Sequence, residues 1–137
     1  MKLSKPEIIE KSINNNWLNV FLVPNPILAI ITRIIIDNYN LKKENILIVS
    51  LRDTSLEIFD HNYLIIQRKK YDKYLEKIFF DSPSGRRVLR KINSTHKNFL
   101  LFSGWAYREV NWLITKHNCK GHIHVEEGQS AYASYTE

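Results

Sequence analysis

Two apolar runs with a proline-led helical pattern between them constrain the fold more than any other feature of the chain. Residues 19–23 form a short apolar run, which is typical of a strand covered on both faces of a parallel sheet. Pro24 and Pro26 end this strand because neither can donate a hydrogen bond to a sheet, and Pro26 suits the first position of a helix. The helical pattern runs to about Tyr39, and a second apolar run follows at 44–51. The sequence therefore predicts a strand–helix–strand unit, the elementary piece of an α/β fold.

The rest of the chain continues the alternation of strands and helices. We expect further strands at 56–59, 63–67, 98–102 and 122–125, and further helices at 70–80, 86–92 and 107–117. Gly121 is expected to act as the stop signal after the last of these helices. This order predicts one α/β domain over residues 1–137, Rossmann-like and doubly wound, with a mainly parallel sheet.

Composition fits one globular domain and excludes several classes of protein. A length of 137 residues, 44% hydrophobic and 25% charged, excludes disordered and collagen-like chains. The single cysteine, Cys119, excludes a disulfide framework and a cysteine-based zinc cluster, and it fits a reducing, cytoplasmic compartment. The apolar stretch at 20–36 is interrupted by two prolines and Arg33, so we interpret it as a buried strand and helix rather than a membrane span.

The excess of basic residues favours an anionic partner. The net charge is +6, which fits nucleic acid, phosphorylated sugars or a membrane surface equally well. The densest basic region lies at 86–91, either as a cationic groove or as a solvated helix face. Peripheral contact with the inner face of a membrane through basic residues stays open. We expect no nucleic-acid partner, because the sequence contains no nucleic-acid-binding fingerprint.

Three segments follow predicted strands, where parallel sheets bind their ligands. They are the turn around Asn25, the pair Ser103-Gly104, and the acidic turn Glu126-Glu127-Gly128. Adjacent carboxylates raise one another's pKa, which suits a general base for a hydroxyl group, and Gly128 lets the backbone turn close to a ligand. The alternative is a solvated acidic turn that only closes the strand.

Two histidines and the lone cysteine are weaker candidates. His122 and His124 share one face of a predicted strand, so they could chelate a metal, but no further ligand can be placed beside them. We therefore expect no metal site and no cofactor. Cys119 has no base at a readable spacing, and the chain contains neither a phosphate-binding P-loop nor a serine nucleophile elbow.

The strand at 122–125, the acidic turn Glu126-Glu127-Gly128 and the nearby Tyr132 resemble bacterial sialyltransferases. The similar groups are the capsule polysialyltransferases and the lipooligosaccharide sialyltransferases of glycosyltransferase family 52, which carry an acidic-acidic-Gly motif after a strand of their N-terminal domain. The stretch at 19–28 also looks like the first strand, turn and proline-led helix of that domain.

This resemblance implies the N-terminal, acceptor-side half of a GT-B enzyme. Glu126 would deprotonate an acceptor hydroxyl that attacks CMP-sialic acid with inversion, Glu127 would support the charge or geometry of the motif, and no metal would be required. Asn25, Ser103 and Gly104 are expected to contact the glycan acceptor. The family's His-Pro motif and its Ser-containing motif, which hold the nucleotide, are absent from this sequence. We therefore expect little activity from this half alone. The competing interpretation is a non-enzymatic α/β module that binds an anionic partner.

Overall fold

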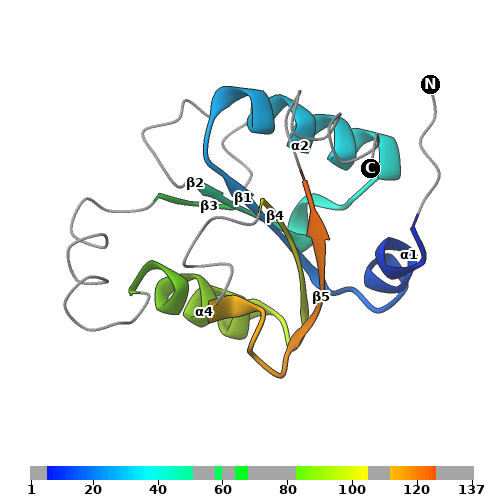
Figure 1. The fold of residues 1–137 in the computed structure, drawn as a ribbon. Coiled ribbons are helices and arrows are strands. Elements are labelled where there is room, and N and C mark those ends of the chain that lie inside the picture. The colour runs from blue at the N-terminus through cyan, green and yellow to red at the C-terminus, as the bar shows by residue number, and fades with distance from the viewer. Residues whose placement is uncertain (1–5, 51–57, 60–63, 68–82, 105–111, 126–137) are drawn as a thin grey trace, which may run out of the picture.

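The chain folds around a five-stranded parallel sheet (Figure 1). The computed structural model describes residues 6–50, 58–59, 64–67, 83–104 and 112–125. The strands are β1 (Leu18–Val23), β2 (Ile46–Ser50), β3 (Leu64–Gln67), β4 (Phe99–Ser103) and β5 (Cys119–His124), in the spatial order β3-β2-β1-β4-β5. The described helices are α1 (Glu7–Asn14), α2 (Pro26–Tyr39) and α4 (Pro83–Thr95), with a 3-10 turn, η1 (Lys43–Asn45), before β2. This confirms the predicted α/β, doubly wound, Rossmann-like class.

The strand–helix–strand unit forms as its sequence predicts. The Asn25 side chain caps α2 by accepting a hydrogen bond from the Leu28 backbone N–H at 2.9 Å, and Pro26 takes the first helical position. Asn40 ends the helix in the left-handed region, with φ of 54°. The second strand begins at Ile46 rather than at residue 44, because residues 44 and 45 belong to η1.

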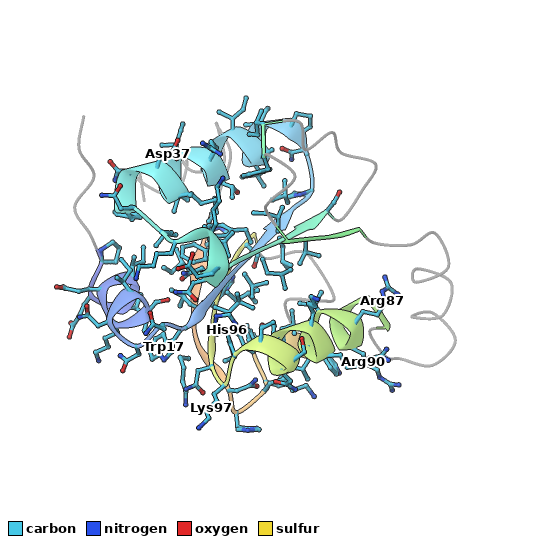
Figure 2. The ribbon with its side chains drawn as sticks, turned by 180° about the vertical axis from the view of Figure 1, so that it is seen from behind. Trp17, Asp37, Arg87, Arg90, His96 and Lys97 are labelled. Atoms are coloured by element: carbon cyan, nitrogen blue, oxygen red, sulfur yellow. The ribbon has the colours of Figure 1, made fainter. Side chains whose placement is uncertain are left out.

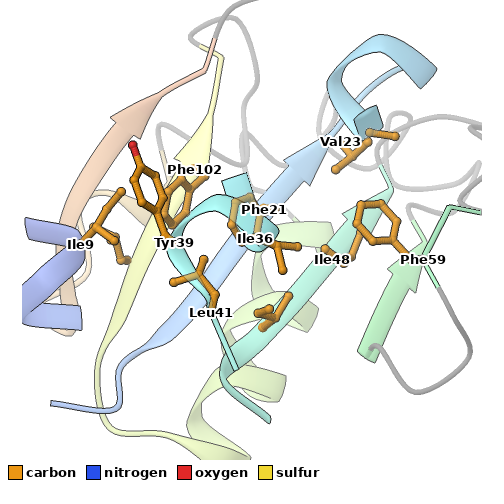
Figure 3. Close-up of a cluster of buried hydrophobic side chains, with 12 residues drawn as sticks. Ile9, Phe21, Val23, Ile36, Tyr39, Leu41, Ile48, Phe59 and Phe102 are labelled. Carbon is orange, nitrogen blue, oxygen red and sulfur yellow. The ribbon is translucent and has the colours of Figure 1, made fainter. Parts of the chain in front are cut away.

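Alternating side chains of the central strands pack on two separate apolar layers. Strands β1, β2 and β4 are buried along their whole length, so they contribute to both faces of the sheet. Helices α1 and α2 cover one face, and α4 covers the other (Figure 1). Figure 3 shows the layer under α2, where the rings of Phe21 and Phe102 stack with centroids 4.2 Å apart.

Gly121 lies inside β5 and does not end a helix, so that prediction is wrong. The pairing register shifts there: Phe99 pairs with Cys119, and Leu100 pairs with Gly121. A Cβ atom on Gly121 would lie 3.2 Å from Leu100 Cδ1 and 3.3 Å from Ile8 Cγ1. The absence of a side chain at Gly121 therefore suits the irregular pairing of β5 and leaves room for the close approach of α1.

The other predicted helices and strands agree with the structure to different degrees. The basic helix predicted at 86–92 is longer and spans all of α4, whereas the helix predicted at 107–117 is helical at 112–113 and turns over 114–118. Residues 58–59 form a turn rather than strand, and β3 confirms the strand predicted at 63–67. The predicted helix at 70–80 and residues 107–111 lie outside the described residues.

Helix α1 has no counterpart in the sequence predictions. Ile9 and Ser12 are its buried residues, and Ile8 and Ile13 pack beside the core, so the apolar side of the helix faces the sheet. None of the helices that the structure describes is long and apolar enough to cross a membrane.

Candidate functional site at the carboxyl edge of the sheet

The strand order places the candidate site between β1, β4 and β5. From β1 the chain moves outward through β2 and β3, then crosses back to β4 on the other side of β1. This reversal makes the carboxyl ends of β1 and β4 the point where open α/β sheets bind ligands. Asn25 follows β1, Ser103 ends β4, and Gly104 comes next. The acidic turn at 126–128 follows β5 in sequence but lies outside the described residues.

A side-chain pair joins Ser103, the last residue of β4, to His122 inside β5. Ser103 Oγ lies 2.8 Å from His122 Nε2, and the Ser103 carbonyl oxygen lies 3.3 Å from the same nitrogen. The Val125 backbone N–H donates to the Ser103 carbonyl at 3.0 Å, which continues the pairing beyond β5. Ser103 is only 1% exposed, whereas His122 is half-buried. The serine therefore fixes the imidazole of His122 at the edge of the sheet.

Burial favours the neutral form of the His122 imidazole. Desolvation lowers the pKa of His122, the hydrogen bond to the Ser103 carbonyl raises it, and the neighbouring His124 lowers it again. A neutral imidazole has one donor and one acceptor nitrogen, so it can pass a proton or orient a hydroxyl group.

His122 and His124 lie on the same side of β5, as their alternation with Ile123 predicts. Their ring centroids are 6.4 Å apart and the ring planes are nearly perpendicular, at 84°. Ile123 and Val125 pack on the opposite layer, under α1 and α2. Within the described ranges, no group of three His, Cys, Asp or Glu residues could hold a metal ion.

Three other residues singled out in the sequence, Asn25, Gly104 and Cys119, are half-buried in the structure. Asn25 is half-buried and caps α2, and Gly104 is half-buried directly after β4. Cys119 is half-buried at the start of β5, where burial raises the pKa of its thiol and a hydrogen bond with the backbone of Gly121 lowers it. A raised pKa leaves less of the thiolate, which is the nucleophilic form of cysteine.

The sequence predicted the strand at 98–102, with Ser103 directly after it, and the strand at 122–125 that contains His122, but it did not pair these residues. In the structure Ser103 is the last residue of β4. Their contact depends on β4 and β5 being neighbours and on the register that pairs Leu101 with His122. Nothing in the order of strands along the chain specifies that neighbour relation.

A second polar feature lies on α4, away from the candidate site. Arg87, Arg90, Lys91 and Ser94 line an open hollow of about 400 Å³ on its outer side. Val88 and Ile92 point the other way and are fully buried in the layer beneath α4. The basic region at 86–91 is thus the outward half of an amphipathic helix.

Comparisons of the chain with protein-family models, curated proteins and solved structures gave no significant match.

Proposed function

We propose that the chain is the acceptor-side, Rossmann-like domain of an inverting, sialyltransferase-like glycosyltransferase. The observation that carries the proposal is the strand order. The acidic turn follows β5 in the sequence, and β5 pairs with β4, one of the two strands whose carboxyl ends form the reversal point of the sheet. The same edge carries an imidazole that Ser103 holds in place and whose pKa is lowered by burial, which suits the recognition of sugar hydroxyl groups.

In the proposed reaction, the carboxylate of Glu126 takes the proton of an acceptor hydroxyl. The hydroxyl oxygen then bonds to the anomeric carbon of CMP-sialic acid, the bond to the CMP phosphate breaks, and CMP leaves with that electron pair. Glu127 supports the charge or geometry of the turn, and Gly128 gives the backbone its close approach to the ligand. Asn25, Ser103 and Gly104 contribute to the acceptor side. A general base of this kind supplies roughly a 10²–10⁴-fold acceleration.

The leaving phosphate also needs stabilisation, which the proposed acceptor-side domain does not provide. The family's nucleotide-binding motifs do not occur in these 137 residues. We therefore propose that turnover needs a nucleotide-binding half, supplied by further polypeptide. On the same basis we propose a cytoplasmic location, where the thiol of Cys119 stays reduced.

The first test is binding of an acceptor sugar to the 137-residue chain. Titration with lactose, followed by ¹⁵N–¹H NMR, is expected to shift the amide signals of Gly104 and Val125 at the carboxyl edge. Signals from η1, at the opposite edge, should stay in place. Lactose binding that shifts only residues away from the carboxyl edge would contradict the proposed site.

The second test is activity with CMP-sialic acid and lactose. The chain alone is expected to show no turnover, and addition of a nucleotide-binding half of a sialyltransferase is expected to restore it. In that mixture Glu126→Gln should lower turnover about 10²–10⁴-fold. Glu44→Gln is the matched control, because Glu44 is exposed in η1. Undiminished turnover by the Glu126 variant would overturn the role of that residue, and robust turnover by the chain alone would overturn the half-enzyme proposal.

A non-enzymatic module that binds an anionic partner is the second candidate, and the basic hollow on α4 favours it. The lactose titration separates the two functions. A chain that ignores lactose and CMP-sialic acid but binds an anion through Arg90 and Lys91 would be such a module.

A further inference from the structure

Charge is distributed unevenly between the two halves of the described chain. Residues 6–50, which contain α1, β1, α2 and β2, carry four Lys or Arg and four Asp or Glu. Residues 83–104 and 112–125 carry seven Lys or Arg and no acidic residue. The net charge of the described residues therefore comes entirely from the second half, which includes α4.

Much of that charge gathers on the outer side of α4. Arg87, Arg90, Lys91 and Ser94 follow a spacing of three and four residues, so they form one stripe along the helix, and they line the hollow described above. Lys97 follows directly after the helix, and Figure 2 shows Arg90 and Lys97 projecting away from the sheet. Figure 2 also shows Asp37, on α2, at the opposite side of the molecule.

The segment at 112–118, which lies beside α4, contributes aromatic and apolar side chains near these basic residues. Trp112 packs against the same apolar layer as α4, and Lys116 Nζ lies 3.9 Å from the centre of the Trp112 ring. Ile114, two residues further along the chain, is 40% exposed. Asn118 Nδ2 donates to Asn93 Oδ1 at 3.0 Å, so the turn is fixed to the end of α4.

We propose that this basic face, defined by Arg87, Arg90, Lys91, Lys97 and Lys116, docks on an anionic lipid bilayer. Lipid phosphates would occupy the hollow on α4, and Ile114 would insert at the boundary between headgroups and acyl chains. A helix with a basic polar face is typical of such surfaces, and the nearby tryptophan and isoleucine suit the interfacial region. A bilayer explains the exposed apolar group, which a nucleic-acid phosphate backbone would leave without a partner.

The inference does not depend on the proposed function, because lipid binding requires no sugar chemistry. It also distinguishes this face from α2, where Ile27, Ile30 and Ile34 are each more than half exposed. Helices α2 and α4 lie on opposite faces of the sheet, so one flat bilayer cannot contact both (Figure 1).

The test is co-sedimentation of the full chain with phosphatidylcholine vesicles that contain either no phosphatidylglycerol or 30% of it, at low ionic strength. We expect binding only to the vesicles with phosphatidylglycerol, and release as salt is added, because salt screens exposed charges. Each basic side chain near an anionic surface contributes roughly fivefold to the partition coefficient, so Arg90→Gln with Lys91→Gln should lower binding about 25-fold. Ile114→Ser should weaken binding further.

Lys11→Gln with Lys42→Gln is the matched control, since it removes the same charge from exposed positions outside the basic face. Both double variants should keep the wild-type thermal unfolding midpoint, because all four side chains lie outside the buried core. Equal loss of binding in the two double variants would overturn the proposal, as would equal binding to both kinds of vesicle. Binding to a DNA duplex through Arg90 and Lys91, with no binding to vesicles, would overturn it in favour of a soluble polyanion.

Discussion

A buried polar clamp ties α1 to the sheet, and its removal is expected to destabilise the whole domain. Ser12 Oγ donates to Asn19 Oδ1 at 2.7 Å, and Asn19 Nδ2 donates to the Asn45 carbonyl at 3.1 Å. Ser12 and Asn19 are 0% and 2% exposed, so neither side chain can exchange its partner for bulk water. Asn19 therefore links α1, β1 and η1 at the amino edge of the sheet.

The size of the effect follows from these contacts. Asn19→Ala removes two hydrogen bonds of about 1 kcal/mol each and separates the buried Ser12 hydroxyl from its acceptor, for a total of roughly 3–4 kcal/mol. Ser12→Ala removes one bond and should cost about 1–2 kcal/mol. In the double variant the shared bond is lost only once, so its cost should fall short of the sum by about 1 kcal/mol or more.

Urea unfolding, followed by circular dichroism, measures these free energies, and an unchanged m-value would show that the unfolded state is comparable in all three variants. A cost below about 0.5 kcal/mol for Asn19→Ala is the size expected of a surface position and would refute the reasoning. Strictly additive costs would show that the Ser12–Asn19 bond contributes nothing of its own.

Three further predictions concern the strand irregularity, the pH dependence and α2. Gly121→Ala should cost about 1 kcal/mol, because the side chains of Leu100 and Ile8 can move by a few tenths of an ångström, whereas Gly121→Val should cost roughly 2–3 kcal/mol by overpacking; equal costs by urea unfolding would contradict this. Burial lowers the pKa of His122 in the folded state, so as the pH drops below about 6.5 the unfolded state takes up a proton more readily than the folded state. The free energy of unfolding should therefore decrease below that pH. His122→Gln should flatten that dependence, and an unchanged pH profile would argue against it. Ile30→Ser on the exposed side of α2 should change stability by less than about 0.5 kcal/mol, and a larger loss in thermal unfolding would show that this side is covered.

Local signals account for the parts of the fold that the sequence predicted well. The segment from β1 to β2 needs only two apolar runs, two prolines and a capping asparagine, all within about thirty residues. In such a segment the local conformational preferences agree with the tertiary fold, so pattern and structure coincide. The amphipathic pattern of α4 is equally local, and the helix in the structure is three residues longer than predicted at each end.

Long-range contacts account for the parts that the sequence did not reveal. A glycine after a helical pattern indicates a helix stop, but Gly121 is required by the approach of Ile8 in α1, more than one hundred residues away in the sequence. The Ser103–His122 pair likewise depends on which strands are neighbours. Helix α1 is short, and most of its stability comes from packing against the sheet.

The position of β5 at the edge of the sheet explains why this strand can carry two histidines. The central strands β1, β2 and β4 are buried on both faces, so a histidine there would lose hydration with little space for a polar partner. Strand β5 lies at the edge of the sheet, and His122 and His124 remain half-buried on it. An edge strand thus gives a side chain both a fixed neighbour, here Ser103 of β4, and access to solvent.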